Sequence, residues 1–586
     1  MAPARRPRRL ARSLLGFPLD RSLSSGELRL EIDASGVVSF IDTARSERLI
    51  VAPSLAFLVP SGEVTVEGIS KTGRGFEARV RSADFEAKVE ILAAQEGLIF
   101  GSEIVPKRDL ELQRLAVLPS GTELNLYDVV NYRNRHYTPN TWPELLLGGR
   151  GCETDTFSRD WQFAPHPSMM MLRKEETAIC FGALDLPTSF GLYLKASDFR
   201  VDELALEYGG LLLPVGTPFC PPRFTLFLDH GRTPDETAAA YTGRLVEEGV
   251  VPDPAEKTRY GWHRDPVYCT WMDQGFVARE TPADELGEQQ LTGSNPTVEA
   301  LDESFVRESL AKMDVEGLKF GIYLLDDGWQ VTRGQWDAHP ERFPDLRGVV
   351  DEIHARGMKV IVWWNWAEVF DNADVDPNHV AGGDWRNAHG RRVRDYSKPA
   401  TQEEYFKPFF RKLFSSDPDC YDFDGFKSDF LADKVHPEMP LHDPEWRGEE
   451  NYAYRLFELC YRTMRTYKPD GCHIGCAGHP YLAEFIDINR TYDVATSNYR
   501  EHENRSKMLK ALTPGCPVAY DLHNFIERFE EYFESTRRSG DSFHIGNIFG
   551  MRIDRLSPWE PADERHFEPM RDALAKAFWS DGVGGN

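Results

Sequence analysis

The sequence lacks the marks of several large functional classes. No apolar run reaches the 18 residues that suggest a membrane-spanning helix. The apolar run at residues 14–17 is too short for the core of a signal peptide, and Pro18 and Asp20 end it. The 16 histidines form no His-Glu-x-x-His zinc motif, and there is no glycine-rich phosphate loop. The sequence therefore indicates neither a membrane protein nor an enzyme that depends on zinc or a nucleotide.

Positive charge is also scarce. Lys and Arg number 68 against 94 Asp and Glu, which gives a formal net charge of −26. Such a surface repels phosphate backbones and anionic lipids, so neither nucleic acid nor a membrane is expected as a partner. Five arginines stand among the first twelve residues, and we interpret residues 1–25 as a flexible basic terminus. An acidic enzyme with a neutral small-molecule substrate fits this balance better.

Cysteine is sparse, and its spacing suggests no disulfide framework. Nine cysteines, an odd number, are scattered over 586 residues, which suits reduced thiols in the cytoplasm better than disulfides. The segment Cys472 to His479 contains two cysteines and two histidines and could be mistaken for a zinc site. Its cysteines are four apart, however, and no second pair exists elsewhere, so zinc is disfavoured. We predict a cytoplasmic protein.

The chain is too long for one ordinary domain and suits a barrel of roughly 250 to 350 residues plus a second domain. Its first part shows short alternating apolar runs, such as Leu28 to Ile32, Val37 to Ile41 and Phe85 to Ile91. Turn residues punctuate these runs, and this pattern predicts a β-sandwich over residues 26–255. A helix at about Pro234 to Glu248 and a link at Val251 to Thr258 follow.

Strands alternate with helical stretches over residues 256–586, as expected of a parallel (β/α)8 TIM barrel. Eight strands, the number that a closed barrel needs, are predicted at Val267 to Trp271, Gly321 to Leu325, Lys359 to Trp364, Gly425 to Phe430, Cys472 to Cys476, Tyr492 to Thr496, Val518 to Tyr520 and His544 to Ile548. Helical periodicity falls at Ser304 to Glu316, Leu346 to Arg356 and Ala453 to Thr466. The predicted fold class is α/β and β multidomain, an N-terminal β-supersandwich followed by the barrel.

Acidic and aromatic side chains gather where the predicted barrel strands end, at the face where barrel enzymes act. Aromatic rings stack on the apolar face of a pyranose, while carboxylates accept hydrogen bonds from its hydroxyls. One such end could be structural, for instance an Asp that caps a helix, but five together indicate a sugar site. They read Trp271-Met272-Asp273-Gln274, Asp326-Asp327-Gly328-Trp329, Trp363-Trp364-Asn365-Trp366-Ala367-Glu368, Lys427-Ser428-Asp429 and Cys476-Ala477-Gly478-His479, and Arg490 and Asp493 lie near the sixth strand.

The fourth predicted strand, Gly425 to Phe430, carries two charges on one face. Lys427 and Asp429 are two apart, so an extended strand points both side chains the same way. Burying an isolated charge is costly, so this pair needs a reason. It is either a satisfied core ion pair or a carboxylate nucleophile held ionised beside a cation. The neighbouring strand ends favour the nucleophile.

These residues also resemble a family. The run Gly321 to Trp329 with its Asp-Asp-Gly-Trp, followed by Phe-Pro-Asp-Leu at 343–346 and Trp363-Trp364, is similar to the barrel of glycoside hydrolase family 36, the α-galactosidases or melibiases. Families 27 and 31 share the pattern more loosely. Lys427-Ser428-Asp429 resembles the family's Lys-x-Asp nucleophile motif, Cys476-Ala477-Gly478 its Cys-Ser-Gly loop, and Arg490 to Asp493 its Arg-x-Ser-Asp stretch.

The resemblance implies a retaining α-glycosidase with Asp429 as the nucleophile and Asp493 as the acid/base. Lys427 would keep Asp429 ionised and bind a hydroxyl. The other substrate-binding residues implied are Asp326, Asp327, Trp329, Trp364, Cys476 and Arg490, with the two tryptophans as walls. No cofactor is expected, because two carboxylates suffice for this chemistry. The expected partner is a small molecule or oligosaccharide with a terminal α-linked sugar, and a homo-oligomer is left open.

The acid/base assignment has alternatives. Tyr492 replaces the usual Ser, and an alignment through Thr496 to Asn498 would put Asn498 at the catalytic position. In that case Glu501, Glu503 or no residue would supply the proton. Arg490 and Asp493, three apart, could also form an ion pair on a helix.

Other functions also remain open. Transfer of the sugar to another sugar, as in raffinose-synthase-like relatives, would use the same covalent intermediate. A sugar-binding protein that has lost catalysis would bind tightly without turnover. An unrelated barrel enzyme, such as an aldolase or isomerase, would need a metal cluster or a Schiff-base lysine, for which Lys427 is the only candidate. Galactose, N-acetylgalactosamine and glucose are all candidate sugars.

Overall fold

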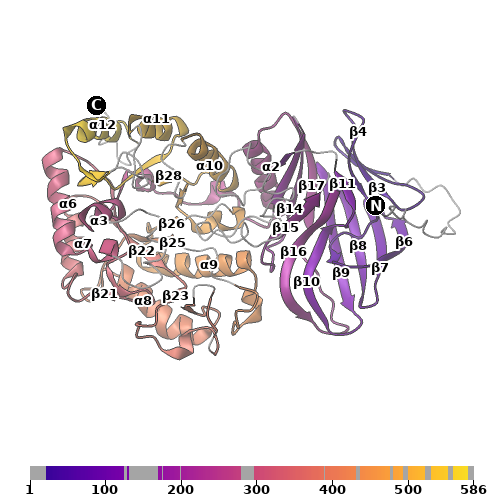
Figure 1. Cartoon of the computed structure of the whole chain (residues 1–586), viewed down its shortest axis with the longest axis horizontal. Coiled ribbons are helices and arrows are strands. Elements are labelled where there is room, and N and C mark those ends of the chain that lie inside the picture. The colour runs from indigo at the N-terminus through magenta and orange to yellow at the C-terminus, as the bar shows by residue number, and fades with distance from the viewer. Residues whose placement is uncertain are drawn as a thin grey trace, which may run out of the picture.

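The fold is described from a computed structural model that covers residues 22–124, 128–130, 169–174, 176–197, 200–278, 296–383, 385–387, 390–429, 436–475, 479–491, 499–521, 529–551 and 558–577. Two layered antiparallel sheets form the N-terminal half, and a closed barrel ringed by helices forms the C-terminal half beside it (Figure 1). The predicted fold class is therefore confirmed. No helix within these ranges is both long and apolar enough to cross a bilayer.

The first sheet is nine-stranded, in the order β1-β2-β3-β4-β11-β16-β10-β5, with β15 paired to β16. The second is eight-stranded, in the order β12-β13-β14-β17-β9-β8-β7-β6. The bounds of the first set are β1 (Ser22–Ser25), β2 (Leu28–Ile32), β3 (Val38–Asp42), β4 (Glu47–Ala52), β5 (Val59–Pro60), β10 (Leu110–Leu118), β11 (Thr122–Leu124), β15 (Leu192–Ser197) and β16 (Arg200–Leu213). Those of the second are β6 (Thr65–Lys71), β7 (Gly75–Arg81), β8 (Phe85–Ala94), β9 (Gly97–Pro106), β12 (Asp128–Val130), β13 (Met169–Lys174), β14 (Thr177–Ala183) and β17 (Phe224–His230).

Alternating side chains explain how the two sheets stack. In β8 the residues Phe85, Ala87, Val89 and Ile91 are buried, whereas Glu86 and its alternates are exposed or half-buried. Because side chains on a strand alternate between faces, one face of each sheet contributes to a shared core. That core contains Leu30, Phe40, Phe57 and Phe100 among its buried residues.

A helix joins the two halves. Helix α2 (Pro234–Glu247) follows the sandwich and packs against both β14 and helix α10 (Tyr499–Leu512) of the barrel. Met169, Cys180 and Tyr241 on the sandwich side form one buried cluster with Met508 and Leu509 on the barrel side. This shared apolar cluster fixes the position of the sandwich against the barrel.

The barrel closes through eight parallel strands in the order β18-β19-β22-β25-β26-β27-β28-β29, with β29 paired back to β18. They are β18 (Val267–Cys269), β19 (Ile322–Leu325), β22 (Lys359–Asn365), β25 (Gly425–Asp429), β26 (Cys472–Gly475), β27 (Ile488–Arg490), β28 (Val518–Asp521) and β29 (Ser542–Ile545). The surrounding helices include α3 (Trp271–Ala278), α6 (Glu303–Glu316), α7 (Leu346–His354), α8 (Lys407–Phe414), α9 (Glu449–Tyr467), α11 (Phe529–Ser539) and α12 (Glu564–Ala575).

Seven of the eight barrel strands lie where the sequence predicts them, and the sixth does not. We expected it at Tyr492 to Thr496, which lies outside the described residues, whereas the sixth strand is β27, Ile488–Arg490. This strand pairs with β26 and β28 and so occupies the sixth position. Its residues Asn489 and Arg490 are polar yet buried. A strand with two polar residues out of three gives no apolar run to detect.

Candidate active site

The C-terminal ends of β19, β22, β25 and β27 bring charged side chains to one end of the barrel. Parallel pairing places Trp363 of β22 beside Lys427 of β25, and Asn365 beside Asp429. Because neighbouring parallel strands in register point paired side chains to the same face, these four residues share the interior of the barrel. These four side chains are therefore held by rigid strands rather than by loops.

Lys427 forms a buried ion pair with Asp326, the residue that follows β19. Its Nζ lies 2.6 Å from Asp326 Oδ2, and both side chains are less than a tenth exposed. Cys269 Sγ, at the end of β18, donates to the same oxygen at 3.3 Å. Burial, and then the Arg490 charge, act to lower the pKa of Lys427, but Asp326 and Asp429 outweigh them and the pKa is raised. Lys427 is thus a fixed cation.

The pKa of Asp326 is lowered, as expected for the acidic partner of an ion pair. Burial acts to raise it, but the Lys427 charge and hydrogen bond, with the backbone N–H of Asp327, lower it overall. Asp326 therefore stays ionised inside the barrel. A carboxylate that is held ionised can still accept hydrogen bonds from sugar hydroxyls through its remaining lone pairs.

Asp327 belongs to a second network. Gln330 Nε2 donates to its Oδ1 at 2.5 Å, and Arg333 Nη2 donates to its Oδ2 at 2.6 Å. Arg333 also approaches Glu368 Oε2 at 3.7 Å. Asn387 donates to the other Glu368 oxygen at 3.2 Å. Sequence reasoning missed Arg333, because only the folded chain brings it to Asp327 and Glu368.

Asp429 ends β25 and is the most accessible of the site carboxylates that the structure describes. Its side chain is 18% exposed, against 4% for both Asp326 and Asp327. Trp363 Nε1 donates to Asp429 Oδ2 at 3.0 Å, and Arg490 Nη2 of β27 lies 3.8 Å from Oδ1. An oriented, accessible carboxylate beside a cation is the arrangement that a carboxylate nucleophile requires.

One expectation about charge partners needs correction. Lys427 Nζ donates to Asp326 rather than to Asp429, and Arg490 is a described cation that lies 3.8 Å from Asp429. This point does not follow from sequence spacing, because it depends on which neighbouring strand each side chain meets. Arg490 ends strand β27 rather than lying on a helix, but Asp493 lies outside the described residues, so the alternative of an Arg490–Asp493 pair stays untested.

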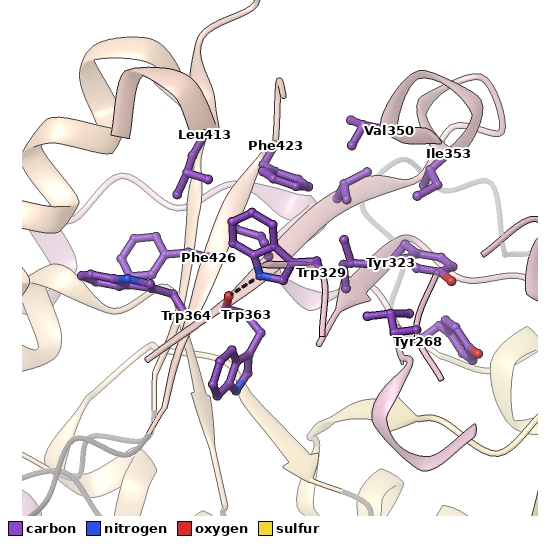
Figure 2. Packing of buried hydrophobic residues seen from close by; sticks show 14 of the residues in the cluster. Tyr268, Tyr323, Trp329, Val350, Ile353, Trp363, Trp364, Leu413, Phe423 and Phe426 are labelled. Atoms are coloured by element: carbon purple, nitrogen blue, oxygen red, sulfur yellow. Dashed lines mark hydrogen bonds between the residues drawn. The ribbon is translucent and has the colours of Figure 1, made fainter. Parts of the chain in front are cut away.

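Trp329 and Trp364 do not form walls of the site, contrary to the prediction. Both rings are buried in the layer between strands and helices, and Trp329 Nε1 donates to the Trp363 carbonyl oxygen at 2.9 Å. Trp364 packs against Phe410 and Phe426. Figure 2 shows Trp329 and Trp364 on one side of the strand and the Trp363 indole on the other. Because adjacent residues on a strand face opposite ways, the tryptophan that reaches the site is Trp363.

Of the acid/base candidates, Asp493 and the side chain of Glu501 lie outside what the structure describes. Cys476, a predicted substrate-binding residue, also lies outside it. Glu503 is described, on α10, and its Oε1 accepts from Arg538 Nε at 3.0 Å and from Ser535 at 3.2 Å, both on α11. Glu503 is thus engaged between two outer helices, an arrangement that does not favour it as the proton donor.

The histidines of the Cys472 to His479 segment are satisfied by protein neighbours. His473 Nδ1 donates to the Phe485 carbonyl at 2.7 Å, so Nε2 accepts from the Ser428 hydroxyl, also at 2.7 Å. His479 Nε2 lies 2.7 Å from Glu450 Oε2. The Ser428–His473 bond ties the outer face of β25 to β26, and the protein contacts of both histidines give neither a reason to bind zinc.

His473 makes the stability of the barrel depend on pH. Burial lowers its pKa to about 4, although the Phe485 hydrogen bond and Asp487 act in the other direction. A histidine whose folded pKa lies below its unfolded value contributes stability above the unfolded pKa of about 6.5 and loses it as the pH falls toward 4. We expect a loss of about 2 kcal/mol from this residue between pH 7 and pH 5.

Urea unfolding of the native chain and of His473→Gln at both pH values measures this contribution. The variant is expected to be less stable at pH 7 and to show a pH dependence smaller by about 2 kcal/mol. Equal pH dependence in the two proteins would show that His473 does not exclude a proton on folding.

Comparison with known proteins matches this barrel to carbohydrate-active enzymes. Residues 282–527 match the family model described as the glycosyl hydrolases family 31 TIM-barrel domain. The matched model is thus that of family 31, which the sequence resemblance included as a looser relative, and not that of family 36. The finding supports the predicted glycosidase.

One curated relative is the A type blood α-D-galactosamine galactosaminidase of Flavonifractor plautii, 25% identical over 223 residues. The match covers 34% of this chain and 20% of the relative, so the chain spans about a fifth of that protein's length. This relationship is confined to one part of both chains.

Solved structures share the fold along nearly the whole chain. An α-N-acetylgalactosaminidase of Bifidobacterium bifidum, in complex with GalNAc, has a TM-score of 0.61 and 13% identity over 94% of this chain and 92% of its own. An α-galactosidase of Lactobacillus brevis has a TM-score of 0.53 and 10% identity over 94% of this chain and 82% of its own. At these identities the likeness establishes the order of sandwich and barrel.

Proposed function

We propose that the protein is a retaining α-glycosidase of the α-galactosidase type, from the clan that includes families 36 and 31. The observation that carries this proposal is Asp429, a partly exposed carboxylate at a barrel strand end, oriented by Trp363 at 3.0 Å and with Arg490 at 3.8 Å. The matched glycosyl hydrolase barrel supports the same activity. The substrate is a small molecule or oligosaccharide that ends in an α-linked hexose.

In the first step Asp429 attacks the anomeric carbon. A bond forms between a carboxylate oxygen and this carbon while the bond to the leaving oxygen breaks, and the electron pair departs with that oxygen. A general acid, for which we propose Asp493, gives it a proton. The Trp363 N–H holds Asp429 Oδ2 at 3.0 Å, which fixes the orientation of the attacking carboxylate.

In the second step water opens the glycosyl ester. Asp493, now a carboxylate, takes a proton from water as the oxygen of water bonds to the anomeric carbon, and Asp429 leaves as a carboxylate. Two inversions return the original configuration. Asp326 and Asp327 would accept hydrogen bonds from sugar hydroxyls, and Lys427 would donate a hydrogen bond to a hydroxyl.

Galactose-configured sugars are the proposed substrates because the matched proteins act on such sugars by name. The Flavonifractor plautii relative is named for galactosamine, and the structures for galactosides and N-acetylgalactosaminides. We also propose a cytoplasmic location, which is supported by the seven described cysteines, since none of them forms a disulfide within the described ranges.

A panel of nitrophenyl glycosides tests the proposal. It contains the α-galactoside, α-N-acetylgalactosaminide, α-galactosaminide and α-glucoside, and each β-anomer. We expect turnover of at least one galactose-configured α-glycoside and of no β-anomer. Sugar binding without turnover would overturn the proposal in favour of a binding protein, and products that grow with added acceptor sugar would instead indicate a transglycosylase.

A further inference from the structure

Arg333 lies in the turn between strands β20 (Gln330–Thr332) and β21 (Gln335–Ala338), which form a small hairpin after β19. Its side chain is 8% exposed, so the guanidinium is almost removed from water. It donates to Asp327 Oδ2 at 2.6 Å and lies 3.7 Å from Glu368 Oε2. Two carboxylates from separate segments of the chain therefore hold one buried cation in place.

The same guanidinium lies over an aromatic ring. Its central carbon is 5.2 Å from the centre of the Trp363 ring, within the range of a cation–π contact. The edge of that indole carries the Nε1 that donates to Asp429 Oδ2 at 3.0 Å. Arg333 thus contacts the residue that orients the proposed nucleophile.

We propose that Arg333 is a positioning residue for Asp429, acting through the Trp363 indole, while it also fixes Asp327 at the sugar-binding end of the site. This inference rests on the proposed function and adds a residue to it. The position of the guanidinium sets the tilt of the indole, and the tilt sets the direction of the Nε1–H toward the carboxylate.

The chemistry of arginine suits this task better than that of lysine. A planar guanidinium can donate sideways to Asp327 while its face lies on an indole, whereas an ammonium offers no flat face. Burial acts to lower the pKa of Arg333, but Asp327 and Glu368 outweigh burial and raise it, and Asp429 adds in the same direction. The cation therefore keeps its charge beside the nucleophile.

The test compares Arg333→Lys, Arg333→Met and a control, Arg391→Met. Arg391 lies over the Phe370 ring at 4.2 Å and is half-buried, so it shares the stacking but not the contact with Trp363. We expect both Arg333 variants to lose about 100-fold in kcat, the loss typical of a misplaced catalytic group. The control is expected to keep kcat within about twofold.

A second variant separates positioning of Asp429 from support of Asp327. Gln330→Ala removes the other donor to Asp327 and leaves the Trp363 contact in place. It is expected to raise KM with kcat nearly unchanged, because it weakens only sugar binding. The proposal requires that the Arg333 variants lose kcat while Gln330→Ala keeps it.

A double-mutant cycle with Trp363→Phe gives the decisive readout, since Phe keeps a ring but has no N–H. If Arg333 acts through the Nε1–H, the double variant loses little more than either single variant. Losses in kcat that multiply in full, or an Arg333→Met enzyme with native kcat, would overturn the inference. If the native chain turns over no α-glycoside, the proposed function fails instead.

Discussion

Replacement of Asp429 by alanine is expected to lower kcat for an aryl α-galactoside by at least about 10⁴-fold, the scale of loss when a nucleophile is removed. The protein is expected to fold, because the Asp429 side chain is partly exposed and the residue ends its strand. Azide fits the space that the lost carboxylate leaves and can attack the anomeric carbon from the same side. It should restore turnover and give a β-galactosyl azide.

The control is Asp374→Ala, which removes an exposed carboxylate from a loop and should leave kcat unchanged. Product configuration is read by proton NMR. An α-configured azide, or no rescue from a folded variant that still binds sugar, would place the nucleophile elsewhere. Residual activity above a few per cent of native would do the same.

The second large effect is expected at the Lys427–Asp326 pair. Lys427→Met leaves the Asp326 carboxylate buried without its cation, and only the Cys269 thiol and a backbone N–H remain as donors. Breaking a buried pair on one side costs about 3 to 5 kcal/mol. We therefore expect Lys427→Met to lower the free energy of unfolding by about that amount, and to abolish turnover.

The double variant Lys427→Met with Asp326→Leu distinguishes pairing from packing. Replacing both charges by apolar groups of similar size is often nearly neutral for stability, so the double variant should be more stable than Lys427→Met alone while remaining inactive. Lys412→Met is the matched control, because the Lys412–Asp337 pair is about half exposed and should contribute less than about 1 kcal/mol. A stability loss no larger than that of the control would contradict a buried charge pair.

Much of the fold was predictable because its strands show local patterns of apolar residues in the sequence. The alternation in Phe85 to Ile91 and the apolar runs at 322–325 and 359–364 each report burial directly. Strand β27 escaped notice because Asn489 and Arg490 are polar, and their burial depends on partners from other strands. Local apolar periodicity cannot report such a strand.

Sequence spacing placed Asp326, Asp327, Lys427 and Asp429 at or just after strand ends, where the structure also has them, but it could not tell which tryptophan faces the barrel interior. The sequence shows Trp363 and Trp364 side by side, and strand geometry allows only one of them to face the interior. The register of Trp363 with Lys427 decides between them, and that register is a property of the assembled barrel. Arg333 was missed for a related reason, since its contacts with Asp327, Glu368 and Trp363 join three separate segments.

The central claim, that Asp429 carries the glycosyl group, is tested most directly by trapping the intermediate. A 5-fluoro-α-galactosyl fluoride slows both steps, because the fluorine destabilises their oxocarbenium-like transition states. Its fluoride leaving group speeds only the first step, so that the glycosyl-enzyme accumulates. Mass spectrometry of the intact protein should show one added sugar, and peptide mapping should place it on Asp429. A label on any other residue, or turnover of the α-galactoside by an enzyme that is never labelled, would contradict this account.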